Sequence, residues 1–321
     1  MAVLIPCYNE AVAIQHVVRD FRAALPGASI YVYDNNSTDQ TVALAKAAGA
    51  IVRTETRQGK GNVIQRMFSD VEADVYVLVD GDNTYDASIA PRMIDTLVER
   101  ALDMVVGRRI ASTQAAYRPG HRFGNNLLTG VVAMIFGNRT SDMLSGYRIF
   151  SRRFVKSFPA LSRGFEIETE LTVHALELRM PIADVDTHYA DRLPGSSSKL
   201  STIKDGFRIL GMIGVLVKEE RPMQFFGLLS ALLALVAVAL SYPIFLEYMR
   251  TGLVPRFPTA ILSSATMIAA ILSFFAGLIL DSVTHGRREM KRLAYLGLDS
   301  ISLALERAQR FDPAARSRST P

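Results

Sequence analysis

The chain has 321 residues, one cysteine, 36 Lys and Arg against 31 Asp and Glu, and a formal net charge of +5. This length holds one large or two ordinary domains with a full core, so disulfides are not needed, and Cys7 is interpreted as a small buried hydrophobe. The positive excess lies largely in the C-terminal third without any helix-turn-helix, finger or aromatic-plus-basic sheet pattern, so we expect no nucleic-acid partner.

From residue 1 the chain alternates short apolar runs with stretches of helical spacing. This alternation is typical of an α/β fold, and it predicts a mostly parallel sheet with helices on both faces. Helices are predicted over 10–25, 40–48, 61–70 and 127–136. Strands are predicted over 2–5, 29–33, 50–53, 75–79, 103–107 and 182–188.

The acidic pair Asp80 and Asp82, with Gly81 between them, follows the apolar run 75–79. In open α/β sheets, ligands bind at the C-terminal ends of the strands, which is where this pair is expected to lie. Two carboxylates can place hard oxygens on one Mg²⁺ or Mn²⁺ beside a phosphate group. Taken alone, Asp-X-Asp is common and also fits a solvated turn.

Two apolar segments, 225–246 and 259–280, are each 22 residues long and carry no formal charge. About 20 such residues span the hydrocarbon core of a bilayer, so both are predicted to be transmembrane helices. Basic residues are few in the connecting stretch 247–258 and frequent on both outer flanks, which predicts cytoplasmic flanks by the positive-inside rule. Since nothing at the N-terminus resembles a signal peptide, we expect a multi-pass protein of the inner (plasma) membrane whose first two hundred residues face the cytoplasm.

Five motifs in order carry a family resemblance: residues 5–10 (Ile-Pro-Cys-Tyr-Asn-Glu), 34–39 (Asp-Asn-Asn-Ser-Thr-Asp), 59–61 (Gly-Lys-Gly), the acidic pair, and 144–148 (Leu-Ser-Gly-Tyr-Arg). Together they resemble a family 2 glycosyltransferase with the GT-A fold. The resemblance covers residues 1 to about 210 and is greatest to the polyprenyl-phosphate group, which includes dolichol-phosphate mannose synthases and bacterial undecaprenyl-phosphate glucosyltransferases. The two apolar segments are similar to the membrane hairpin of some of its members.

The apolar segments, the helical spacing of residues 203–217 and the resemblance together predict a domain order. A cytosolic GT-A domain is expected over 1–202, a juxtamembrane amphipathic helix over 203–222, two transmembrane helices over 223–281 and a cytosolic basic tail over 282–321. Small residues in the two spans would allow helices of two copies to pack closely, so a homo-oligomer is also expected. These residues include Ser230, Ser263, Ser264 and Gly277.

The resemblance further implies an inverting, metal-dependent transfer of a hexose from a UDP- or GDP-linked sugar to a polyprenyl phosphate at the cytoplasmic membrane face. Asp80 and Asp82 would hold Mg²⁺ or Mn²⁺, Arg109 would meet the acceptor, and Asp142 matches the position usually assigned as general base. The donor site implied in the same way comprises Pro6, Tyr8, Glu10, Asp34, Lys60, Asp80, Gly81, Asp82, Arg192 and Lys199.

Several of these roles have plainer alternatives. Glu10 also fits the first turn of a helix, and Lys60 also fits a solvated loop lysine. Because a phosphate monoester is already mostly ionised at neutral pH, Asp142 is expected to orient the acceptor or the sugar at least as much as to remove a proton. Further arginines suit phosphate contacts, namely Arg108, Arg122 and Arg148. Glu166, Glu168 and Glu170 are interpreted as exposed helix acids, with contacts to sugar hydroxyls or a cation as the alternative.

Two other functions stay open at this level. A processive, polysaccharide-directed glycosyltransferase is disfavoured because the chain has no tryptophan and so no Gln-X-X-Arg-Trp motif. A non-catalytic, membrane-tethered nucleotide-sugar binder is disfavoured by the intact acidic pair and Asp142. The sequence leaves the sugar and the nucleoside undecided.

Overall fold

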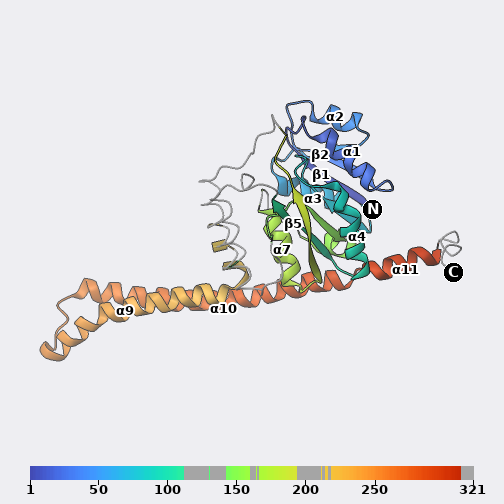
Figure 1. Ribbon diagram of the computed structural model, residues 1–321. Coiled ribbons are helices and arrows are strands. Elements are labelled where there is room, and N and C mark those ends of the chain that lie inside the picture. Colours follow the sequence, from blue (N-terminus) through green and yellow to red (C-terminus); the bar gives the residue numbers. More distant parts are fainter. Residues whose placement is uncertain are drawn as a thin grey trace. The chain divides into compact units, whose positions relative to one another are not determined.

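The computed structural model describes residues 1–111, 142–159, 166–193 and 218–311, with the single positions 130, 164, 211, 214 and 215 (Figure 1). The chain divides into two compact units, one formed by residues 1–207 with 291–321 and the other by residues 208–290. The predicted helix over 127–136, apart from position 130, and most of the juxtamembrane segment 203–222 lie outside the described residues.

A seven-stranded sheet forms the centre of the first unit, in the order β3-β2-β1-β4-β6-β5-β7. Only β6 runs antiparallel to its neighbours β4 and β5, and the other pairs are parallel. The mostly parallel α/β fold is therefore confirmed. The strands are β1 (Ala2–Cys7), β2 (Ser29–Asp34), β3 (Ile51–Thr54), β4 (Val75–Leu78), β5 (Met104–Ala111), β6 (Arg148–Ser151) and β7 (Ile182–Tyr189).

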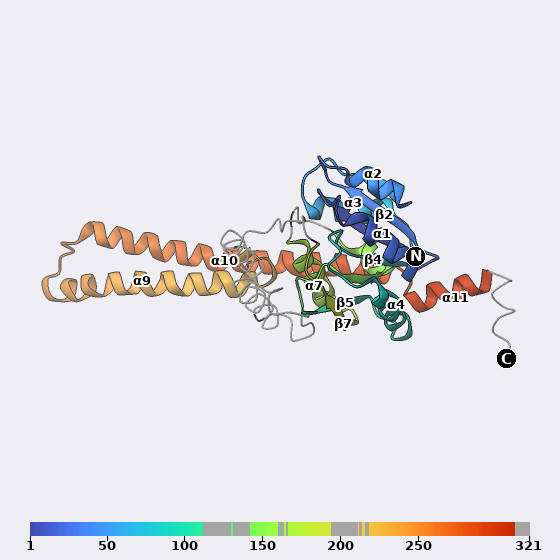
Figure 2. The same ribbon diagram turned by 45° about the horizontal axis from the view of Figure 1, so that its top comes forward.

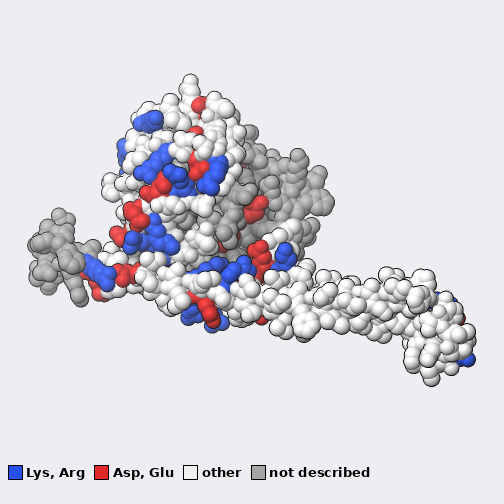
Figure 3. Space-filling view, turned by 180° about the vertical axis from the view of Figure 1, so that it is seen from behind, with Lys and Arg blue, Asp and Glu red and all other residues white. Residues whose placement is uncertain are grey.

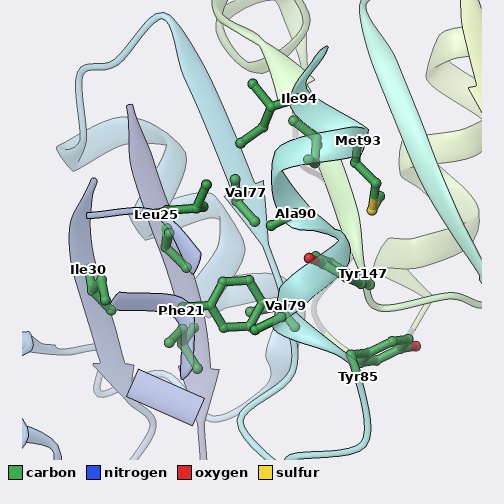
Figure 4. Packing of buried hydrophobic residues seen from close by; sticks show 14 of the residues in the cluster. Phe21, Leu25, Ile30, Val77, Val79, Tyr85, Ala90, Met93, Ile94 and Tyr147 are labelled. Carbon is green, nitrogen blue, oxygen red and sulfur yellow. The ribbon is translucent and has the colours of Figure 1, made fainter. Parts of the chain in front are cut away.

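Helices cover both faces of this sheet because side chains along each buried strand alternate between the faces. Val3 and Ile5 of β1 join the core formed with α1 and α4, whereas Leu4 joins the core formed with α3, α6 and α7. Figure 4 shows the first of these cores, in which the Phe21 ring meets Tyr147 edge-on at 5.8 Å between centroids. The helices and one 3₁₀ turn are α1 (Ile14–Ala24), α2 (Thr41–Ala47), α3 (Lys60–Asp70), η1 (Ala87–Ile89), α4 (Ala90–Glu99), α6 (Arg152–Ser157) and α7 (Ile167–Glu177).

The second unit is a hairpin of two long helices, α9 (Pro222–Thr251) and α10 (Phe257–Leu296), which lie side by side (Figure 2). Both helices are long and apolar enough to cross a membrane. On the face that Figure 3 shows, the middle of the hairpin is nearly free of charge, whereas acidic and basic side chains are interleaved on the first unit.

Small side chains form the contact between the two hairpin helices. The buried residues of α10 recur every seventh position, at Ser263, Ala270, Gly277 and Thr284. The Ser263 hydroxyl donates to the Ala237 carbonyl of α9 at 2.9 Å, and a Cβ placed on Gly277 would lie 2.9 Å from the Phe226 Cβ. Two of the small residues expected to face another copy, Ser263 and Gly277, therefore serve contacts within the chain, and self-association stays a prediction.

The segment that follows the hairpin belongs to the first unit. It comprises the end of α10 and α11 (Ile301–Phe311). The Tyr295 hydroxyl donates to Asp103 Oδ2 at 2.7 Å, and Ile301 is 3 % exposed among the core residues of α1 and the sheet. The α/β unit is therefore built from chain on both sides of the hairpin.

Candidate active site

The C-terminal ends of β1, β2 and β4 lie next to one another and form the rim of the candidate site. In the β1–β2 register Cys7 pairs with Asp34, and the Val79 amide donates to the Leu4 carbonyl of β1 at 3.1 Å, so Asp80 emerges beside the end of β1. The rim thus brings together three of the motifs that carry the family resemblance.

Hydrogen bonds from side chains connect the loop after β1 to the loop after β2. The Thr38 amide donates to Asn9 Oδ1 at 2.8 Å, and the Asn9 amide donates to Ser37 Oγ at 2.8 Å. Asn9 has φ 54°, a left-handed conformation that asparagine tolerates better than most residues. The Glu10 amide donates to Thr41 Oγ1 at 2.9 Å. Because these hydrogen bonds hold the backbone of Asn9 and Glu10 in the loop, α1 begins at Ile14, four residues later than the predicted helix.

The residues predicted to bind the nucleoside lie at the ends of β1 and β2 and on the loop after β1. Asp34 and Glu10 are buried, at 4 % and 8 % exposure, whereas Tyr8 is 37 % exposed. The Asp34 carboxylate accepts the Ser37 amide at 3.2 Å and thereby shapes its own loop. Pro6 lies in β1. The four positions share one rim, and their contacts with a base or ribose stay predictions.

Asn35, which was not predicted as a site residue, positions Lys60. Its amide nitrogen donates to the carbonyls of Glu55 and Arg57 at 2.8 Å each, and its Oδ1 accepts the Gly59 amide at 2.7 Å. Gly59 has φ 130°, which side chains rarely adopt, so glycine is required directly before Lys60. The signal in the sequence was the run of Asn and Asp after β2, whose side chains readily bond to nearby backbone.

Each carboxylate of the acidic pair contacts a basic side chain. Lys60 Nζ lies 2.5 Å from Asp80 Oδ1, and a nitrogen of the Arg192 guanidinium lies 2.6 Å from Asp82 Oδ2. Thr84 Oγ1 also donates to Asp82 Oδ1, at 2.6 Å. Lys60 and Arg192 are therefore brought to the acidic pair, whereas Lys199 lies outside the described residues.

The donor set of the acidic pair fits a divalent cation. Burial, followed by the charge of Asp80, raises the pKa of Asp82 although Arg192 and Thr84 act to lower it, so a cation beside the two carboxylates would be favoured. Within the described residues no group of three His, Cys, Asp or Glu side chains could hold a metal by itself. The other ligands would be phosphate oxygens and water, as is usual for Mg²⁺.

Two glycines let the backbone approach the acidic pair closely. A Cβ on Gly81 would lie 2.6 Å from Cys7 Sγ, and a Cβ on Gly146 would clash with the Asp80 carboxylate, whose Cγ would lie at 2.7 Å. The Gly146 amide donates to the Tyr85 hydroxyl at 2.9 Å. The loop before β6 is thus packed directly against Asp80.

Asp142 and Arg109, predicted as separate catalytic residues, form a bidentate ion pair. Arg109 Nε lies 2.7 Å from Asp142 Oδ2, and a terminal nitrogen of the same guanidinium lies 2.7 Å from Oδ1. Although burial favours the protonated acid, the hydrogen bonds and charge of Arg109 hold the pKa of Asp142 below its ordinary value. Asp142 is therefore ionised at neutral pH.

The structure corrects the interpretation of two other charged residues, Arg148 and Glu168. Arg148 is fully buried and donates to the carbonyls of Met143 and Ser145, so it is not available to a phosphate. Arg108 is half exposed and pairs with Asp186, so its contact with a phosphate stays a prediction. Glu168 was expected to be an exposed helix acid, yet it is 6 % exposed and contacts Lys60. Helical spacing alone could not reveal its burial because three acids alternate there. Arg122 lies outside the described residues.

Comparison with known proteins agrees with this geometry. The model of the family described as "Glycosyl transferase family 2" matches residues 2–158. The glycosyltransferase AglJ of Haloferax volcanii is 33 % identical over 306 residues, which cover 92 % of this chain and 98 % of AglJ. The chain belongs to glycosyltransferase family 2.

Two further likenesses concern more distant members. This family 2 glycosyltransferase is 26 % identical over 221 residues to the dolichyl-phosphate hexose transferase of H. volcanii, which covers 69 % of this chain and 95 % of that protein. Its fold is similar to that of glucosyl-3-phosphoglycerate synthase from Mycobacterium tuberculosis in complex with Mn²⁺, UDP and glucosyl-3-phosphoglycerate, with a TM-score of 0.55, 21 % identity, and 68 % and 78 % of the two chains covered. The GT-A fold expected from the sequence is thereby confirmed.

Proposed function

We propose that this glycosyltransferase transfers a hexose, with inversion, from a nucleotide sugar to a polyprenyl phosphate at the cytoplasmic face of the membrane. The observation that carries the proposal is the acidic pair on the rim of the sheet with Lys60 and Arg192 bonded to it. Such a site matches a diphosphate with its cation, because it provides both carboxylate ligands for the metal and basic groups for the phosphates.

On the donor side, a divalent cation held by Asp80 and Asp82 would neutralise the negative charge that develops on the leaving nucleoside diphosphate. Lys60 and Arg192 would contact the phosphate oxygens from the same rim. The M. tuberculosis structure, which contains Mn²⁺ and UDP, supports a divalent metal and a nucleotide donor. Either Mg²⁺ or Mn²⁺, and either uridine or guanosine, is compatible with these residues.

On the acceptor side, Arg109 is the cation proposed to meet the lipid phosphate. Its guanidinium lies 5.5 Å from the centroid of the Tyr189 ring and is held by Asp142, so it is orientated from two sides. Because the acceptor phosphate is mostly ionised at neutral pH, it needs little help from a base. Asp142 is therefore proposed mainly to orient Arg109. Inversion is proposed because no carboxylate among the described residues is assigned as a covalent nucleophile.

The lipid acceptor and the membrane location are supported by the two apolar helices and by the similarity to the dolichyl-phosphate hexose transferase. Arg288 contacts Glu220 at 2.9 Å, which joins the chain entering the hairpin to the chain leaving it. Both ends are rich in Lys and Arg, so the positive-inside rule places both at the cytoplasmic face, with the short connection outside.

The test is transfer of radiolabel from a panel of UDP- and GDP-linked hexoses to polyprenyl phosphate in detergent, followed by organic extraction. We expect one donor to label the lipid with Mn²⁺ or Mg²⁺ and not with EDTA. Asp82→Asn should lower transfer by at least about a hundredfold, as the loss of one strong electrostatic group does elsewhere. Asp186→Asn, which removes an exposed carboxylate away from the acidic pair, is the control.

Undiminished transfer by Asp82→Asn, with its melting temperature unchanged, would refute the metal assignment. Labelling of a water-soluble product alone would refute the lipid acceptor.

A further inference from the structure

Glu168, near the start of α7, lies within the candidate active site although no sequence motif assigned it there. Its Oε1 accepts a hydrogen bond from Lys60 Nζ at 2.5 Å, and the same ammonium donates to Asp80 Oδ1 at 2.5 Å. The Lys60 side chain is 11 % exposed. One buried ammonium therefore bridges a carboxylate from α7 and a carboxylate of the acidic pair.

The presence of Glu168 beside Lys60 needs a physical reason, because the carboxylate of Asp80 is enough to neutralise the Lys60 ammonium. Burying a carboxylate is costly, and Glu168 Oε2 has no hydrogen-bond partner among the described residues although it is buried. A divalent cation and the Lys60 ammonium would compete for the oxygens of Asp80, since both are positive. Glu168 is a partner that Lys60 can keep when the metal takes Asp80.

Hydrogen bonds through Thr172 and Arg148 hold the backbone of Glu168 in place. Its backbone carbonyl accepts Thr172 Oγ1 at 3.1 Å, and Thr172 Oγ1 accepts a guanidinium nitrogen of the fully buried Arg148 at 2.8 Å. Arg148 also binds the carbonyls of Met143 and Ser145, close to Asp142. The first turn of α7 is thus fixed to the loop that packs against Asp80.

We propose that Glu168 is a positioning residue that acts through Lys60. It retains the ammonium beside the acidic pair once a divalent cation occupies Asp80, and so keeps Lys60 available for the diphosphate of the donor. Without a diphosphate, Lys60 competes with the cation for Asp80, so metal and donor bind cooperatively. This inference rests on the nucleotide-sugar donor of the proposed function.

The test is a Mn²⁺ titration of the full-length protein in detergent, followed by electron paramagnetic resonance of the free ion. Without nucleotide, Lys60→Met should bind Mn²⁺ about tenfold more tightly than wild type because the competing ammonium is gone. Glu168→Gln should bind Mn²⁺ about tenfold more weakly, because the Lys60 ammonium then pairs with Asp80 alone and competes more strongly with the cation. Saturating UDP or GDP should tighten Mn²⁺ binding in wild type and much less in Lys60→Met.

The matched control is Glu72→Gln, because Glu72 pairs with Lys156 at 2.7 Å on an exposed part of the same unit, and this variant should bind Mn²⁺ as wild type does. Glu168→Asp, which shortens the side chain while keeping its charge, serves if Glu168→Gln does not fold. The positioning role would be overturned if the Lys60 and Glu168 variants changed the affinity for Mn²⁺ in the same direction, or if neither variant changed it. If wild type itself binds no Mn²⁺ with either nucleotide, the proposed function fails instead.

Discussion

Gly146 is the residue at which one added methyl group reaches the candidate metal ligands. Its missing Cβ leaves the space that the Asp80 carboxylate occupies, and the Asp80 side chain cannot retreat freely because Lys60 holds it. Gly146→Ala is therefore expected to displace Asp80 and to weaken Mn²⁺ binding and transfer by at least about tenfold, as misplacement by roughly 1 Å does in other active sites. Paramagnetic resonance and the transfer assay measure the two effects.

Gly27→Ala is the control, since nothing lies within 4 Å of the Cβ position there. If Gly146→Ala bound Mn²⁺ as wild type does, the close approach to Asp80 would have no functional meaning.

At the scale of elements, the hairpin depends on the small residues that recur along α10. Gly277→Val would place atoms against Phe226 and the Met223 backbone, so the helices must move apart. The hairpin should lose about 1–3 kcal/mol of stability, the usual cost of overpacking. Gly227→Val, at a position with open space, is the comparison. The measurement is thermal unfolding of both variants in detergent, in which Gly277→Val should be less stable than Gly227→Val.

The sequence predicted the parallel strands and the apolar helices because each is marked by an apolar run within its own residues. It did not predict β6, whose four residues Arg148–Ser151 become a strand only by pairing with β4 and β5. The same distinction holds at the site. Asp80 and Asp82 follow a recognisable strand, whereas the Glu168–Lys60 and Arg109–Asp142 contacts join residues far apart in the chain. Tertiary pairing of this kind leaves no local pattern.

At the scale of the whole molecule, residues after the hairpin complete the α/β unit. Ile301→Ala removes a side chain that is 3 % exposed in the core of that unit, so it should lower the free energy of unfolding by about 2–5 kcal/mol. Leu303→Ala, at an exposed position of the same helix, should change it little. Denaturant unfolding of the α/β unit, followed by its tyrosine fluorescence, is the measurement. Equal stability of the two variants would mean that α11 adds nothing to the core.

The return of the chain to the sheet after α10 also sets an order of events during synthesis. Tyr295, which donates to Asp103, and Ile301 leave the ribosome only after both apolar helices have been made. The α/β unit therefore cannot finish folding before both helices of the hairpin have been synthesised. A nascent chain stalled before residue 291 would therefore carry an unfinished and less stable α/β unit.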